Sequence, residues 1–132
     1  MGTFIIKKTP TGFNFHLIAA NSQKIAVASQ VYSSKASCMN ATKSIAKFAE
    51  KAIAEDKIED NTLQKPEAKT CPKFEIYLDK KGEYRYRLYA SNGENIAISE
   101  DGYKSKSGCI NGMKSVSVNA KDATIADETT SK

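Results

Sequence analysis

The stretch that decides the fold runs from residue 84 to residue 119 and reads YRYRLYASNGENIAISEDGYKSKSGCINGMKSVSVN. It contains an alternating strand, an Asn-Gly turn, a second strand and an amphipathic helix. Residues 13–48, FNFHLIAANSQKIAVASQVYSSKASCMNATKSIAKF, repeat this pattern at an offset of 71. The identities at that offset include Leu17 with Leu88, Asn21 with Asn92, Tyr32 with Tyr103, Ser34-Lys35 with Ser105-Lys106, and Cys38 with Cys109. This many matches in one register indicate an internal duplication.

The length favours one domain built from both copies. The chain has 132 residues, and a unit of about 50–60 residues has only a marginal core of its own. We therefore expect a single domain with pseudo-twofold symmetry, composed of repeat one at 3–62, a connector at 63–72, repeat two at 73–129 and a tail at 130–132. Two prolines in the polar segment 63–72 support its assignment as a connector.

Each copy predicts three strands, a helix and a short fourth strand. In the first copy the strands fall at 4–8, 13–19 and 24–29, where apolar and polar residues alternate. The fourth strand is predicted from a recurring motif at 58–62 and 125–129. The fold class is therefore α+β, with two tandem β-β-β-α-β repeats and both helices on one face of the sheet.

The second hairpin is expected to have a three-residue loop. With Gly93 in the left-handed region, that loop places Leu88 opposite Ile96 and keeps the apolar residues on one face. The first copy is expected to follow the same register. There Ser22 replaces the glycine, which predicts some backbone strain.

Ser34 and Ser105 stand just before the two helical patterns and are expected to be N-caps. Cys38 and Cys109 lie on the apolar stripes of these helices, and we expect buried free thiols, with a disulfide as the alternative. The first copy has extra residues before its fourth strand, which predicts one more helical turn through residues 50–55. Cys71 has no histidine or second cysteine near it, so no metal site or other cofactor is predicted.

The composition is that of a globular protein, with 40% hydrophobic and 27% charged residues. No apolar run approaches the roughly 20 residues that span a bilayer, and the first residues lack an apolar signal core. We expect a cytoplasmic protein that does not enter a membrane. The net charge is +5, and residues 1–49 hold six lysines and no acid. That excess fits either a polyanionic partner or lysines that keep a small protein soluble.

The second copy, with Leu88, Ala90, Asn92-Gly93, Tyr103, Ser105-Lys106 and Ser115-Val116, resembles the repeat of the YegP-like family of small uncharacterised bacterial proteins. The resemblance extends over both copies. It implies one antiparallel sheet in which the last strand of each unit is exchanged into the other half, so that residues 58–62 and 125–129 cross over. It implies no agreed activity and supplies no catalytic residues.

The residues favour a binding module over an enzyme. His16 is the only histidine, and no serine or cysteine has a base and an orienting acid in its sequence context. The outward strand face is the candidate binding surface, and its residues are Lys7, His16, Tyr77, Arg85, Arg87 and Tyr89. The favoured function is a small non-enzymatic binding or interaction module with no established activity, for which another protein is one candidate partner. The alternative is single-stranded nucleic-acid binding through this basic and aromatic face. Because the tandem copies supply both halves of the fold, we expect a monomer.

Overall fold

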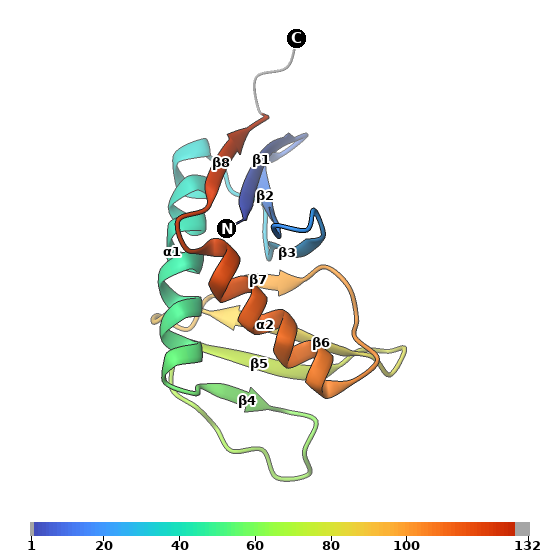
Figure 1. Cartoon of the computed structure of the whole chain (residues 1–132). Coiled ribbons are helices and arrows are strands. Elements are labelled where there is room, and N and C mark those ends of the chain that lie inside the picture. The colour runs from blue at the N-terminus through green and yellow to red at the C-terminus, as the bar shows by residue number, and fades with distance from the viewer. Residues whose placement is uncertain (1, 129–132) are drawn as a thin grey trace.

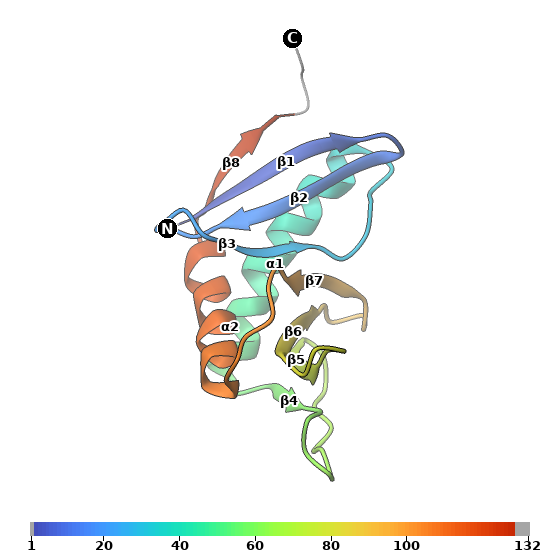
Figure 2. The same ribbon diagram turned by 90° about the vertical axis from the view of Figure 1, so that its right-hand side faces the viewer.

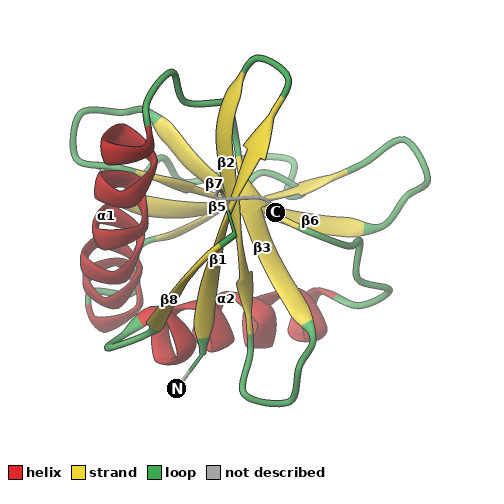
Figure 3. Ribbon diagram, turned by 90° about the horizontal axis from the view of Figure 1, so that it is seen from above, coloured by secondary structure: helices red, strands yellow, loops and turns green. Residues whose placement is uncertain are grey.

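A computed structural model describes residues 2–128, which form one sheet with two helices packed on the same face (Figure 1). The other face is left uncovered, as the view along the sheet shows (Figure 3). The elements in chain order are β1 (Thr3–Thr9), β2 (Gly12–Ile18), β3 (Lys24–Ala28), α1 (Lys35–Ala54), β4 (Ile58–Asp60), β5 (Lys73–Leu78), β6 (Tyr84–Tyr89), β7 (Asn95–Ser99), α2 (Lys106–Ala120) and β8 (Thr124–Asp127). This is the predicted α+β class.

The strand order is β4-β5-β6-β7-β3-β2-β1-β8, so the last strand of each repeat lies at the outer edge of the opposite half. Figures 1 and 2 both place β8 and β4 at opposite ends of the molecule. The exchange is therefore confirmed, although residue 129 of the second predicted strand lies outside the described residues. The expected antiparallel sheet is wrong at both edges, where β8 pairs with β1 and β4 pairs with β5 in parallel. Each edge strand follows a helix that crosses the sheet, and such a crossover, unlike a hairpin, can deliver a parallel neighbour.

Both central hairpins have the predicted three-residue loop but a different register. The Ala90 N–H donates to Glu94 O at 2.8 Å, and Gly93 has φ +86°. Leu88, however, pairs with Ala97 rather than Ile96, because a bulge follows Leu88. The bulge turns two consecutive residues into the core, since Ile96 and Ala97 are both buried.

The first copy has the same bulge, so Leu17 pairs with Ala26 rather than Ile25. In its loop, Ser22 has φ 71°, which is the left-handed conformation that the sequence led us to expect at this position.

One core serves both halves. Fully buried side chains from each repeat meet between the sheet and the helices, including Phe4, Phe15, Leu17, Ile45, Phe74, Tyr86, Leu88 and Met113. The Tyr86 hydroxyl donates to the Ile25 carbonyl of the other repeat at 2.5 Å. Because this hydroxyl bonds across the pseudo-twofold axis inside the core, separating the two repeats would break a buried hydrogen bond.

The helices begin and end as the sequence predicts. Ser34 Oγ accepts from the Ser37 N–H at 3.1 Å, and Ser105 Oγ accepts from the Gly108 N–H at 3.0 Å. Helix α1 has 20 residues and α2 has 15, so the first helix is longer by more than one turn. Cys38 and Cys109 are free and buried. Within the described part of the chain, no helix is long and apolar enough to cross a membrane.

Matching ion pairs hold the two exchanged strands, and the sequence patterns did not predict them. Lys35 at the start of α1 contacts Asp127 of β8 at 2.8 Å, and Lys106 at the start of α2 contacts Asp60 of β4 at 2.7 Å. In each pair a helix of one repeat is joined to the last strand of the other. The Ser-Lys dipeptide that recurs in the sequence therefore supplies both the helix cap and the lysine of this ion pair.

Candidate functional site

The strand register places one row of side chains across the whole uncovered face of the sheet. From β8 to β4 the paired residues are Ala126, Ile5, His16, Val27, Ile98, Arg87, Glu75 and Glu59. The pseudo-twofold axis falls between Val27 and Ile98, so His16 and Arg87 occupy equivalent positions. The half formed by repeat one with β8 is mainly apolar here, whereas the other half is charged.

In the charged half the predicted residues form an internally bonded cluster around Glu75. Arg87 Nη1 contacts Glu75 Oε1 at 3.0 Å, and the Tyr89 hydroxyl donates to the same oxygen at 3.1 Å. The Arg87 guanidinium lies 3.9 Å from the centre of the Tyr77 ring. Arg85 Nε contacts Asp79 at 2.7 Å. Each arginine already has a carboxylate partner, which reduces the positive charge available to a phosphate.

The other two predicted residues lie in the opposite half. Lys7 is exposed and contacts Glu128 at 3.8 Å. Partial burial of His16, followed by the charges of Lys24 and Lys7, lowers its pKa. All six predicted residues thus lie on the uncovered face, but Val27 and Ile98 separate them into two groups. They do not converge on one site, and their predicted role in binding stays a prediction.

The lysine excess of residues 1–49 is partly balanced by acids of the second repeat. Lys24 contacts Glu100 at 3.8 Å, while Lys7 and Lys35 contact Glu128 and Asp127 next to or within the exchanged strand β8. Complementarity between the two repeats is therefore a third explanation for the uneven charge, beside a polyanionic partner and lysines that keep the protein soluble.

The buried thiols are poor nucleophiles. Burial raises the pKa of Cys38 to about 11 and that of Cys109 to about 12, so the thiolate is scarce at neutral pH. Within residues 2–128, no three or more His, Cys, Asp or Glu side chains are grouped so that they could hold a metal ion.

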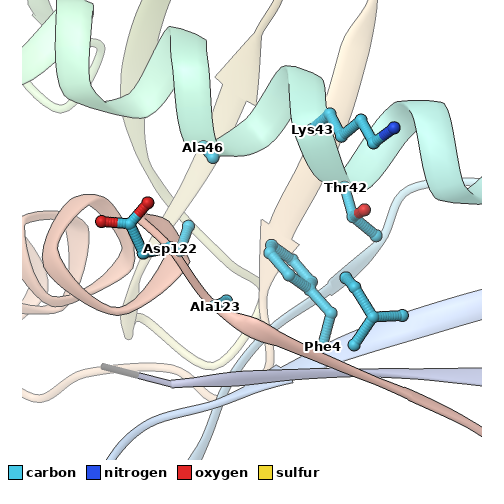
Figure 4. A pocket seen from close by; sticks show the side chains of 8 residues that line it. Phe4, Thr42, Lys43, Ala46, Asp122 and Ala123 are labelled. Carbon is cyan, nitrogen blue, oxygen red and sulfur yellow. The ribbon is translucent and has the colours of Figure 1, made fainter.

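A first pocket, of about 220 Å³, lies beside α1 where the chain passes from α2 into β8. Figure 4 shows the Phe4 ring between α1 and Ala123, with Lys43 and Asp122 on opposite sides of the opening. The pocket is lined mainly by carbon, and Thr42 forms part of its wall. At the position equivalent to Thr42, α2 carries the larger Met113, which is fully buried.

A second opening, of about 330 Å³, lies on the other flank of α1, facing the β6–β7 hairpin. We call it the α1 groove. Its polar rim comprises Ser37, Asn40 and Ser44 from the helix and Ser91, Asn92 and Glu94 from the hairpin, and its apolar part comprises Tyr32, Ala41, Phe48, Ala90 and Ile96. Phe48 is half-buried, and Lys47 Nζ lies 5.3 Å from the centre of its ring.

In the other half, Asn119 of α2 bridges the place that corresponds to this groove. Its Oδ1 accepts from the Ala20 N–H of the β2–β3 hairpin at 3.0 Å, and its Nδ2 donates to Ser115 O at 2.9 Å and to Ser115 Oγ at 3.0 Å. Phe48 stands at the equivalent position in α1 and cannot make this bridge. Both openings therefore occur where α1 differs from α2.

The charged and aromatic residues of the strands gave no indication of these two openings. A signal was nevertheless present in the duplication, because Thr42 aligns with Met113 and Phe48 aligns with Asn119. Helix positions that differ between otherwise matching repeats therefore indicate α1.

Known proteins resemble both the single repeat and the whole chain. A UPF0339 protein of Methanosarcina acetivorans is 58% identical over 53 residues, which are 40% of this chain and 90% of that protein. A UPF0339 protein of Treponema denticola is 53% identical over 55 residues, which are 42% of this chain and 93% of that protein. These relatives therefore have about the length of one repeat.

Two solved structures match almost the whole chain. The YegP protein of unknown function from E. coli has a TM-score of 0.74 at 23% identity, covering 99% of this chain and 96% of its own. UPF0339 protein SO3888 of Shewanella oneidensis has a TM-score of 0.73 at 26% identity, covering 97% of this chain and 92% of its own. The model of the family described as a domain of unknown function, DUF1508, matches residues 11–56 and 79–127, one segment in each repeat. The chain belongs to this DUF1508 family, in a form with two repeats and the YegP-like fold, and the family has no established activity.

Proposed function

We propose that the protein is a non-catalytic interaction module that binds another protein along α1. The observation that carries the proposal is the contrast between the two helices. Where α2 has the large buried Met113, α1 has the smaller Thr42, also buried, in the wall of one opening. Where α2 bonds Asn119 to the neighbouring hairpin, α1 has Phe48 beside the other opening. Two openings on the flanks of one helix provide apolar area with a polar rim, which is the usual anatomy of a protein-binding surface.

A non-catalytic role is supported by the state of the reactive groups. The pKa values of both buried thiols are raised, and the acids of the uncovered face are committed to lysine, arginine and tyrosine partners. A panel of esterase, phosphatase and nuclease substrates tests this part of the proposal. Turnover of one substrate that a single substitution abolishes would contradict it.

The binding surface is tested with matched substitutions in the two helices. Lys43→Glu and Asn40→Arg change exposed residues of α1 that line the openings, and Lys114→Glu and Asn111→Arg change the equivalent exposed residues of α2. The tagged full chain and its variants are used for affinity capture from native lysate, with mass spectrometry of the bound proteins. We expect a protein that the wild type and both α2 variants retain and that both α1 variants lose.

Capture that is equal for the α1 and α2 variants would contradict binding along α1. Nuclease treatment of the lysate separates a protein partner from one that is held through nucleic acid.

The stacked Arg87 and Tyr77 side chains favour one alternative, single-stranded nucleic-acid binding on the uncovered face. A labelled oligonucleotide titrated at low salt, with an Arg85→Ala/Arg87→Ala variant as the comparison, tests it directly. Binding that the double variant loses and that salt weakens would support the alternative.

A further inference from the structure

The two halves of the molecule differ in how a helix is joined to the hairpin beside it. In one half Asn119 is 8% exposed, and its carboxamide joins α2 to the β2–β3 hairpin. It accepts one hydrogen bond from a backbone N–H of the hairpin and donates two to Ser115. The helix and hairpin are thus connected by one planar group that has an acceptor at one end and a donor at the other.

The α1 groove keeps both sides of this arrangement and lacks the group between them. Ser44 is the equivalent of Ser115, and the Ser91 N–H is the equivalent of the Ala20 N–H that Asn119 binds. In the part of the chain that the structure describes, no protein group accepts a hydrogen bond from the Ser91 N–H. Phe48 replaces the asparagine and has no side-chain hydrogen-bonding group to offer the groove.

We propose that the α1 groove binds a carboxamide side chain, Asn or Gln, from an exposed segment of a partner protein. Its carbonyl oxygen accepts from the Ser91 N–H, and its amide nitrogen donates to Ser44, as Asn119 does within the other half. This inference rests on the proposed function and specifies the chemistry that a partner brings to one flank of α1.

The other residues that line the α1 groove determine which partner side chains fit beside the carboxamide. Phe48, Ile96 and Ala41 offer carbon surface, which favours an aliphatic neighbour. Glu94 stands at the rim and is exposed, which favours a basic neighbour over an acidic one. The fitting segment therefore has an aliphatic residue and a basic residue next to its carboxamide residue.

The test uses the ¹⁵N-labelled full chain and three tripeptide amides that differ at the central residue. Acetyl-leucyl-asparaginyl-lysine amide is the probe, the leucine analogue removes both polar atoms at similar size, and the aspartate analogue removes the donor. We expect the asparagine peptide to shift the amide signals of Ser91 and Ser44 and to bind about tenfold more tightly than either analogue, since a tenfold ratio corresponds to one or two net hydrogen bonds. Equal affinity for the three peptides, or shifts confined to other regions, would overturn the proposal.

A substitution in the protein provides the second arm. Phe48→Asn rebuilds the bridge inside the first half, so it should abolish peptide binding. Its effect on the melting temperature is the balance between the new hydrogen bonds and the loss of a ring that packs against the core. Asn119→Ala removes the bridge from the other half and should leave the peptide affinity of the α1 groove unchanged. Peptide binding that persists in Phe48→Asn would count against the proposal.

The peptide result is separable from the proposed function. A partner that is lost on substitution of α1, together with no preference for the asparagine peptide, would retain the interaction module and reject the carboxamide. If the asparagine peptide is preferred but no partner is captured, the result would support the groove chemistry and contradict the proposed function.

Discussion

Two single substitutions, Thr42→Met in α1 and Met113→Thr in α2, each give one helix the residue of the other. They should change the free energy of unfolding in opposite directions. Thr42→Met adds an apolar side chain next to an open pocket of about 220 Å³, well above the roughly 10–15 Å³ that a cavity needs to hold one water. The pocket can therefore accept the longer side chain without displacing Phe4. Met113→Thr instead removes a fully buried side chain from the core and introduces a hydroxyl there.

The sizes of both effects follow from burial. Burying a methionine side chain contributes about 2 kcal/mol, from which roughly 1 kcal/mol is lost through ordering a flexible chain. The Thr42 hydroxyl bonds to Met39 O of the same helix at 2.6 Å, and losing that local bond costs little. We expect Thr42→Met to raise the free energy of unfolding by about 1 kcal/mol. Met113→Thr should lower it by about 3 kcal/mol, the range found for removing large core side chains.

Thermal and urea unfolding of the full chain measure both changes. An unfolding entropy of about 2.1 cal/mol/K per residue gives roughly 0.28 kcal/mol/K for 132 residues. The expected shifts in melting temperature are therefore about +4 °C for Thr42→Met and about −11 °C for Met113→Thr. A destabilised Thr42→Met variant, or a Met113→Thr variant as stable as the wild type, would refute the equivalence of the two positions. If α1 binds a partner, Thr42→Met should also weaken capture of that partner while it raises stability.

Three further predictions concern the turns, the charged edge and the shared core. Ser22 and Gly93 both have positive φ. In urea unfolding, Ser22→Gly should therefore stabilise the chain by roughly 0.5–1 kcal/mol and Gly93→Ser should destabilise it by about 1 kcal/mol. Changes of the same sign would contradict the equivalence of the two turns. Glu59 accepts from Lys73 at 2.8 Å, which with a backbone N–H lowers its pKa from 4.5 to about 2. The charge of Glu59 therefore contributes about 3 kcal/mol to the free energy of unfolding above pH 4.5, and this contribution is lost as the pH falls toward 2. Glu59→Gln should be less stable than the wild type at about pH 7 and equally stable near pH 2. Tyr86→Phe should lower the free energy of unfolding by about 1 kcal/mol through loss of its hydrogen bond across the two repeats, and no change in urea unfolding would show that the bond does not stabilise the core.

The duplication and the alternation of apolar residues were sufficient to predict the elements, the caps and the shared core. Leu88, Cys109 and Ser105 all have the burial or contacts that their positions in the pattern indicate. The register beyond the loop was not predictable in this way. A bulge allows Ile96 and Ala97 to be buried consecutively, whereas the prediction assumed strict alternation along the whole strand.

The candidate site was harder to predict because the type of a residue does not show whether its side chain is already bonded to a partner within the fold. Arg87 and Tyr77 had the residue types of a binding face, but Glu75 and the neighbouring rings engage them within the fold. Their partners come from adjacent strands, so only the pairing of β5 with β6 reveals that the charges are already matched.

The openings beside α1 depend on the opposite kind of evidence, a partner group that is missing. The Asn119 side chain makes one hydrogen bond to the hairpin and two to its own helix, and the Phe48 side chain can make none of them. A duplicated protein carries its own reference for such absences, since the second copy shows how the same backbone is closed by a side chain of the protein itself. Loss of the bridge in one copy exposes a backbone N–H and an aromatic ring together, and these are the two features that a carboxamide beside an aliphatic side chain would cover. For this reason the differences between the repeats, rather than their identities, are the better guide to what the molecule binds.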